Sequence, residues 1–407
     1  MIDGPTLVFI LASALKCAVV VGIMLGMVAY SVVAERRFSA WFQDRIGPNR
    51  VGMLLGGVRI GKFTVPNWRL WGLGQPIVDG LKFILKEEIT PGHVNKPYFF
   101  LAPVLAMVPA LMTVAVVPFG SIIDLRPLAA WVAVSFKLPL DAATLNAFAI
   151  PAVIADLNVG ILFVFAIVSI SVYGIVLAGW SSNSKYSFLG GIRSSAQMIS
   201  YEISMGLAVV PIFLVIGQLN LGKIVEYQAQ HGWLALAVFA PRSHWGAETE
   251  SLVLWPFLAL SFIIFLIAAF AETNRLPFDL AECETELVGG YHTEYGAFKF
   301  ALFFLGEYAA MLVTSAIMVT LFFGGWTLPF HPWLYDVSVA PWWFTPVHIL
   351  VFLGKMFFFI FFFIWVRWTL PRFRYDQLMG LGWKFFIPVA LANVLVTAGI
   401  VAWFQLR

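Results

Sequence analysis

The amino-acid sequence predicts an all-α protein: a polytopic transmembrane helix bundle of about eight spans, with a cytoplasmic interfacial amphipathic helix. Three observations support this class: an apolar composition, recurring apolar stretches of about 20 residues, and basic residues concentrated in alternate connectors. Of the 407 residues, 61% are hydrophobic and 12% are charged, whereas soluble domains have about twice that charged fraction. We therefore expect residues 1–407 to form a single transmembrane domain.

Apolar stretches long enough to cross a bilayer recur along the whole chain. We expect spans near 7–30, 98–118, 152–178, 196–217, 251–271, 298–323, 346–366 and 384–404. The N-terminus lacks the basic region and cleavage pattern of a signal peptide, so the first span should remain as an anchor. The stretch 127–150 is apolar but is interrupted by Pro127, Lys137, Pro139 and Asp141, and we expect an interfacial loop there.

The basic residues predict how the spans are oriented. Most of the 25 Lys and Arg residues lie in the first, third, fifth and seventh connectors, whereas the opposite side holds only Arg126, Lys137, Lys223, Arg242 and Arg407. Basic connectors normally stay on the cytoplasmic side. The odd connectors are therefore expected in the cytoplasm and both termini outside, in a multi-pass protein of a bacterial inner membrane or of an organellar inner membrane.

The fifth connector, residues 272–297, is unusually acidic. Carboxylates packed together repel one another and are costly to desolvate, so a connector that only crossed the membrane surface would be neutral or basic. This composition predicts titratable groups held at the membrane edge. The acids of the connector and of the start of the next span are Glu272, Asp279, Glu282, Glu284, Glu286, Glu294 and Glu307, with Arg275 among them.

Charged residues also occur within the predicted spans, where each costs about 2.5–3.5 kcal/mol on insertion scales. Glu202, Glu307 and Lys355 predict a proton relay if they face one interior, because neighbouring charges shift one another's pKa strongly in a low dielectric. Hydrogen bonding between helices is the alternative. Lys16 and Asp156 also fall within predicted spans and are expected either inside or reaching to the interface.

Basic turns follow the first and seventh spans. Glu35-Arg36-Arg37 precedes a Gly-Pro-Asn turn signature at 47–49, which predicts that the chain folds back so that Arg45 and Arg50 return to the span. Residues 367–377 form a second basic turn, in which Arg372 or Arg374 is expected to pair with acids of the fifth connector. Ordinary basic residues at a cytoplasmic membrane face are the alternative for both turns.

The first connector, residues 35–97, contains a helical pattern of a different kind. Gln75, Asp79, Lys82 and Lys86 recur on one face, and apolar residues group toward the other. This pattern predicts an amphipathic helix lying in the interface, with its polar face toward the cytoplasm or a docked partner. A passive membrane anchor is the alternative.

Motifs for other chemistry are missing. Cys17 and Cys283 are the only cysteines and cannot by themselves form an iron–sulfur cluster or a zinc site, and no nucleotide-binding or zinc-protease motif occurs. His292 adjoins the acids, and a local hydrogen bond is its expected role. We therefore expect no cofactor bound by this chain, and no nucleic-acid partner.

Several segments resemble one known family. They are E-R-R at 35–37, Q-D-R-I-G-P-N-R-V-G at 43–52, the segment 179–202 that ends in A-Q-M-I-S-Y-E, A-E-T-N-R-L-P-F-D-L-A-E-C-E-T-E-L-V at 271–288 and R-F-R-Y-D-Q-L-M at 372–379. Together they resemble the H subunit of proton-pumping NADH:quinone oxidoreductase, respiratory complex I. The resemblance covers the spans and all four cytoplasmic connectors, but not the outer connectors.

The resemblance implies a role in quinone reduction coupled to proton translocation. In that family the membrane subunit and the peripheral quinone-site subunits enclose a long quinone chamber open to lipid, and flavin and iron–sulfur clusters lie in partner subunits. The positions that match the chamber and its mouth are Glu35, Arg36, Arg45 and Asp79. Those that match acids proposed to pass charge toward the antiporter-like subunits are Glu202, Glu272, Glu282, Glu284, Glu286 and Glu307. We expect auxiliary charges at Arg275, Asp279, Glu294, Lys355, Arg372 and Arg374, and small membrane subunits as further partners.

Other functions stay open at this point. The equivalent subunit of a membrane-bound hydrogenase-type complex would keep the same fold and acids. A stand-alone cation/proton antiporter would also hold buried acids and a lysine. A purely structural anchor would not explain acids placed within spans.

Overall fold

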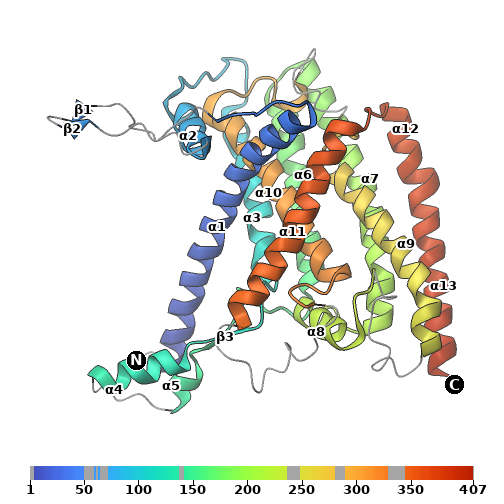
Figure 1. Cartoon of the computed structure of the whole chain (residues 1–407). Coiled ribbons are helices and arrows are strands. Elements are labelled where there is room, and N and C mark those ends of the chain that lie inside the picture. The colour runs from blue at the N-terminus through green and yellow to red at the C-terminus, as the bar shows by residue number, and fades with distance from the viewer. Residues whose placement is uncertain are drawn as a thin grey trace.

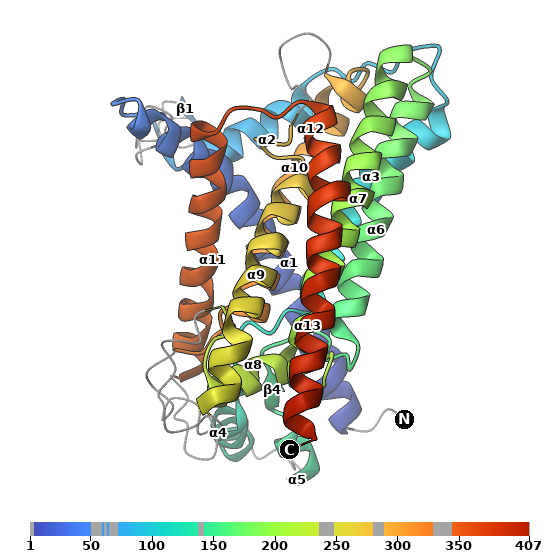
Figure 2. The same ribbon diagram turned by 90° about the vertical axis from the view of Figure 1, so that its right-hand side faces the viewer.

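The computed structural model describes residues 4–49, 59–60, 63–64, 72–136, 142–235, 248–279, 289–328 and 344–406. Within these ranges, eight helices are long and apolar enough to cross a membrane. Figures 1 and 2 show them as a bundle of long helices that run in roughly the same direction. The predicted class and number of spans are confirmed.

The spanning helices are connected by short helices and two small hairpins. The spans are α1 (Gly4–Phe42), α3 (Lys96–Thr113), α6 (Gly160–Ser181), α7 (Lys185–Ile216), α9 (Glu248–Glu272), α10 (Ala297–Phe322), α11 (Phe344–Thr369) and α13 (Ile387–Gln405), which continues α12 (Tyr375–Gly380) through a π-helical segment, Leu381–Phe386. The short helices are α2 (Gln75–Leu85), α4 (Arg126–Phe136), α5 (Ala142–Asn146) and α8 (Leu221–His231). Strand β1 (Arg59–Ile60) pairs antiparallel with β2 (Phe63–Thr64), and β3 (Ile122–Asp124) with β4 (Ala149–Pro151).

The two ends of the bundle carry different elements. Helices α2 and α12 lie at one end, which we call the α2 end, at the top of Figure 1. Helices α4, α5 and α8 lie at the other, the α8 end, and both chain termini are also there. The described parts of the acidic connector, 272–279 and 289–297, and the C-terminal ends of α1 and α11 lie at the α2 end.

Helix α10 is the central element of the core. Its residues from Met311 to Phe322 are all buried, and it packs against α3, α11, α1 and α9. Helices α6 and α3 also approach each other closely, because α6 has a glycine at the contact. A Cβ at Gly174 of α6 would lie 2.7 Å from the main-chain nitrogen of Ala106 in α3, so only glycine fits there. This packing holds the ends of α10 in fixed positions.

Four expected boundaries are wrong. Helix α7 begins at Lys185 rather than near 196, and the last span begins at Tyr375 rather than near 384. The other two differences have a local cause. Helix α1 continues to Phe42 rather than ending near residue 30, because residues 31–42 contain no glycine or proline; the turn comes at Asp44 and Gly47, which have φ of 54° and 78°. Glu35 and Arg36 therefore lie on the helix. The third span begins at Gly160 rather than near 152, because β4 pairs with β3, and Asp156 lies in the loop before the span.

The stretch expected as an interfacial loop, 127–150, is partly helical. It contains most of α4, all of α5 and the start of β4. Lys137, Pro139 and Asp141 lie outside the described residues. The segment remains at the α8 end, beside the start of α1 (Figure 1).

Candidate functional site at the α2 end

A cluster of buried charges joins three spans and the fifth connector. Glu35 of α1 accepts a hydrogen bond from Arg275 Nη1 at 3.0 Å and lies 2.7 Å from Arg367 Nη1 of α11. The Tyr308 hydroxyl of α10 also donates to Glu35, at 2.6 Å. Arg275 Nε lies 2.6 Å from Glu307 Oε1. We call Glu35, Arg275, Glu307, Tyr308 and Arg367 the buried ion network.

The turn after α9 places Arg275. Asn274 has φ of 49°, the left-handed conformation that commonly ends a helix, and the Arg275 amide donates to the Phe270 carbonyl at 3.1 Å. This turn directs the guanidinium back into the bundle, where only 2% of Arg275 is exposed.

Gln197 of α7 holds this turn against the bundle. Its Nε2 lies 2.8 Å from the Ala271 carbonyl, 3.1 Å from Asn274 Oδ1 and 2.9 Å from the Phe278 carbonyl. Asn274 Nδ2 also donates to Ser194 Oγ at 2.9 Å. Because a buried amide fixes its partners geometrically, α7 sets the position of Arg275.

The charges of the buried ion network balance. Two carboxylates face two guanidinium groups, and the Arg275 guanidinium carbon lies 4.1 Å from the centre of the Tyr308 ring. Burial disfavours the charged form of Arg275, but the Glu307 and Glu35 carboxylates outweigh it and raise the Arg275 pKa above its ordinary value. The network thus keeps its cation charged, and removal of one partner leaves an uncompensated buried charge.

Glu202 and Glu272 form a second pair of carboxylates. Ser169 of α6 donates to Glu202 of α7, and Glu272 is the last residue of α9, with 8% of its surface exposed. The two carboxylates are near enough for the Glu202 charge to act on Glu272. Since Arg275 follows Glu272 by three residues, the turn after α9 connects this pair with the buried ion network.

The residues expected at the chamber mouth lie at the surface of the same end. Arg36 Nη1 of α1 lies 3.1 Å from Asp79 Oδ2 of α2, and Gln75 Nε2 donates to Asp79 Oδ1 at 2.7 Å. The Arg45 amide donates to the Ala40 carbonyl at 2.8 Å, a bond that closes the end of α1, and Arg50 of the expected turn lies outside the described residues. The Arg45 side chain is exposed and donates to Gln43.

The remaining candidates divide between the two ends. Arg372 Nη2 lies 3.7 Å from Asp279 Oδ2, whereas Arg374 pairs with Asp376 at 3.1 Å, and Glu294 is half-buried. Lys355 lies elsewhere: its Nζ donates to the carbonyls that follow α10, at the α8 end. Glu282, Glu284 and Glu286 lie outside the described residues.

Comparison with known proteins places the chain in a family. A protein-family model described as NADH dehydrogenase matches residues 15–398. The NADH-quinone oxidoreductase H subunit 2 of Koribacter versatilis is 43% identical over 98% of this chain and 99% of its own length, and the H subunit 2 of Geobacter metallireducens is 44% identical over 98% of both. The H subunit of Leptospira biflexa is 45% identical over 95% of this chain and 94% of its own length.

The chain belongs to the family of NADH-quinone oxidoreductase H subunits.

Membership of the H-subunit family does not reveal which side chains meet, and sequence reasoning missed part of the cluster. In the sequence, Tyr308 is only a neighbour of Glu307, and Arg367 is only one of the basic residues of a turn. Gln197 and Asn274 stand within longer motifs. A tyrosine, an amide or a basic residue at a span end is ordinary in a membrane protein, so no local signal distinguishes them.

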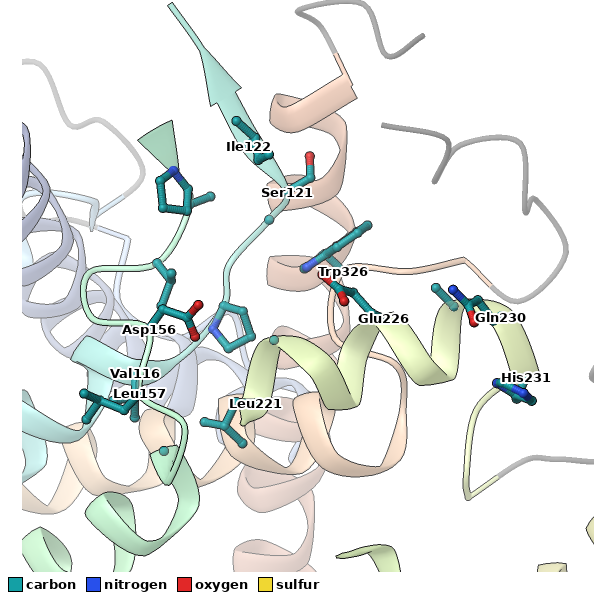
Figure 3. Close-up of a pocket in the computed structure, with 18 residues that line it drawn as sticks. Val116, Ser121, Ile122, Asp156, Leu157, Leu221, Glu226, Gln230, His231 and Trp326 are labelled. Atoms are coloured by element: carbon teal, nitrogen blue, oxygen red, sulfur yellow. The ribbon is translucent and has the colours of Figure 1, made fainter. Parts of the chain in front are cut away.

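This member of the H-subunit family also has a cavity of about 710 Å³ at the α8 end, far along the bundle from the buried ion network. Figure 3 shows Asp156 on the loop before α6, Glu226 and Gln230 on α8, and Ser121 beside β3 around it. Asn220 Nδ2 donates to Asp156 at 2.6 Å, and Lys223 pairs with Glu226 at 2.8 Å. Its acids are already paired, and the cavity is separate from the candidate site.

Proposed function

We propose that this chain forms much of the quinone-binding chamber of an NADH:quinone oxidoreductase and couples quinone reduction to proton translocation. The chain is a membrane subunit of that enzyme by family. The α2 end supplies the chamber wall, and the buried ion network supplies the polar groups at its head. Electrons come from flavin and iron–sulfur clusters in partner subunits.

The observation that carries this proposal is the convergence of charge on Glu35. One carboxylate contacts Arg275, Arg367 and Tyr308, which belong to three separate elements. Buried ionisable groups whose protonation is set by specific partners are typical of functional sites. A site for a long isoprenoid quinone needs apolar walls with a few convergent polar groups, and this arrangement supplies the polar part.

The proposed coupling step is electrostatic. Two-electron reduction of a quinone gives an anion that becomes the neutral quinol only after it takes up two protons, so the charge next to Glu35 changes between electron transfer and protonation. A change in the charge of Glu35 alters its electrostatic attraction for Arg275, which also faces Glu307. Glu202, Glu272 and the connector acids Glu282, Glu284 and Glu286 then pass the change toward the antiporter-like subunits.

The mouth of the chamber is assigned to the surface of the α2 end. Arg36, Asp79 and Arg45 lie there, and the exposed apolar side chains Ile77, Ile84 and Leu85 of α2 suit a helix resting on lipid. A quinone entering from the membrane would pass this helix before it reaches Glu35.

The proposed orientation follows the basic residues. The α2 end carries the basic turns and faces the cytoplasm, and both termini lie outside, in a bacterial inner membrane. The proposed partners are the peripheral quinone-site and iron–sulfur subunits at the α2 end and the antiporter-like and small membrane subunits beside the bundle.

The experiment is Glu35→Gln in the assembled complex, with NADH:quinone turnover measured against quinone concentration. Loss of the charge at the centre of three donors is expected to lower the turnover number or raise the quinone KM at least tenfold. Glu226→Gln is the matched control, because Glu226 is an exposed acid at the α8 end. Unchanged quinone kinetics in an assembled Glu35→Gln complex would remove the proposal.

A further inference from the structure

An apolar groove runs along α1 in the half of the bundle nearer the α8 end. It has a volume of about 300 Å³ and lies between α1, α11 and the segments around β3 and β4. Leu15, Val19 and Ile23 of α1 and Leu353 of α11 contribute to its lining, which is almost wholly apolar. Lys16 is the one charged residue that lines it.

The depth of Lys16 in the membrane follows from the geometry of α1. Lys16 and Arg36 are 20 residues apart on one helix, which corresponds to about 30 Å at 1.5 Å per residue. The hydrocarbon core of a bilayer is also about 30 Å thick. With Arg36 at one boundary of the hydrocarbon core, Lys16 reaches the opposite boundary. Because α1 is inclined, its rise across the membrane is shorter than its length, and the long Lys16 side chain covers the difference.

The methylene groups of Lys16 line the groove, and its ammonium group makes one hydrogen bond. Its Nζ donates to the Val153 carbonyl at 2.8 Å, and an ammonium group has three donors. The cation is therefore anchored on the loop after β4 and retains donors for an anion. The groove continues from there toward the bilayer centre, past Val19 and Ile23 to Met27.

We propose that this groove binds a phospholipid of the leaflet at the α8 end, with its phosphate on Lys16 and one acyl chain along α1. The outward side of α1 is little covered by the rest of the chain: Leu15 is 66% and Ile23 is 52% exposed. Gly22 and Gly26 have no neighbouring atom within 4 Å of the position that a Cβ would take. An apolar groove open to the bilayer, with a single cation at headgroup depth, fits an acyl chain and its phosphate.

The site would link three parts of the chain that are distant in sequence. Its lining comes from α1, from the loop after β4 and from α11. The bound lipid would thus fix the start of α1 against α11 at the α8 end. This role is independent of the quinone chamber, which is proposed at the α2 end.

The test is photolabelling of the assembled complex in nanodiscs of phosphatidylethanolamine and phosphatidylglycerol, with a diazirine on the phosphatidylglycerol acyl chain. Cross-links are expected on the α1 peptide that contains Val19 and Ile23 and on the α11 peptide that contains Leu353. Lys16→Met should lower their yield about fivefold, the contribution of one lysine to holding an anionic lipid, and Lys16→Arg should retain it. Ile23→Trp should also lower it by filling the groove.

The matched control is Leu395→Trp, since Leu395 is 66% exposed on α13 and does not line the groove. Equal labelling of α1 and α13 in the unaltered complex would overturn the proposal without any variant. Unchanged labelling in both Lys16→Met and Ile23→Trp would do the same. Two other outcomes would also overturn the proposal. One is a photoreactive residue at position 23 that cross-links to a helix of another subunit. The other is labelling of the groove by a quinone analogue in place of phospholipid.

Discussion

Buried charge is balanced differently at the middle of α10, around Glu307, and just beyond its end at Phe322. Near the α2 end, Glu307 faces Arg275, which in turn faces Glu35, so side-chain charges are balanced by other side-chain charges. Beyond the α8 end of the same helix, Lys355 Nζ donates to main-chain carbonyls at 2.7, 2.9 and 2.5 Å, those of Phe323, Gly325 and Thr327. Glu307 and Phe323 are separated by 16 residues, about 24 Å along a helix.

Gln228 of α8 completes the arrangement at the α8 end. Its Nε2 donates to the Thr320 carbonyl and its Oε1 accepts from the Gly324 amide, both at 2.9 Å, and Lys355 Nζ lies 4.1 Å from the Trp233 ring. A cation at the C-terminus of a helix is stabilised by the carbonyls there. Carbonyls do not titrate, whereas carboxylates do. We therefore propose that proton exchange takes place among the carboxylates of the α2 end and that Lys355 caps α10 at the α8 end.

The largest expected effect is at the α2 end. Arg275→Met leaves Glu35 and Glu307 without their shared cation, and breaking a buried ion pair costs about 3–5 kcal/mol. We expect most of the assembled complex to be lost, measured by native gel and by thermal unfolding of what remains. Arg374→Met is the control, because Arg374 is 74% exposed and pairs with its neighbour Asp376. Equal amounts of both assembled variants would contradict a structural need for the buried cation.

An intermediate effect is expected at the α8 end. Lys355→Met removes the donor shared by three carbonyls, and buried polar groups left unsatisfied cost about 1–3 kcal/mol. The unfolding temperature of the complex should fall, while the number of protons pumped per electron should stay unchanged in the complex that assembles. A lower pumping ratio in Lys355→Met would break the comparison, because it would place proton chemistry at both ends.

The smallest effect on stability is expected at the surface of the α2 end. The side chains of Arg36 and Asp79 are 51% and 29% exposed, and exposed ion pairs contribute about 0–1 kcal/mol. Arg36→Gln should therefore leave assembly unchanged and raise the quinone KM severalfold, measured by steady-state kinetics. Arg126→Gln is the control, since Arg126 forms a comparable exposed pair with Asp124 at the α8 end. An unchanged quinone KM would remove Arg36 from the chamber mouth.

The sequence predicts the spans well because hydrocarbon imposes a simple rule on length and composition. It also indicates that Glu202 and Glu307 need partners, because a charge within a span is costly. It does not identify those partners. Glu35 and Arg275 are 240 residues apart in the chain, and only the packing of α1 and α9 against α10 brings them together.

The residue pattern also does not fix where a helix ends or which of its charges are buried. The first span exceeds its apolar stretch because residues 31–42 continue the helix although they include charges. Neighbouring elements then decide which of these charges is buried: 5% of Glu35 is exposed, whereas the next residue, Arg36, is mostly exposed. The residue pattern alone assigns both to one basic turn.

The most direct test of the central claim is the proton-to-electron ratio of Glu307→Gln in proteoliposomes that contain the assembled complex, with Glu226→Gln as the control. We predict that NADH:quinone turnover continues at a reduced rate and that fewer protons are pumped per electron in Glu307→Gln, whereas Glu226→Gln pumps normally. A normal ratio together with normal turnover in Glu307→Gln would contradict the claim that the buried ion network couples the two reactions.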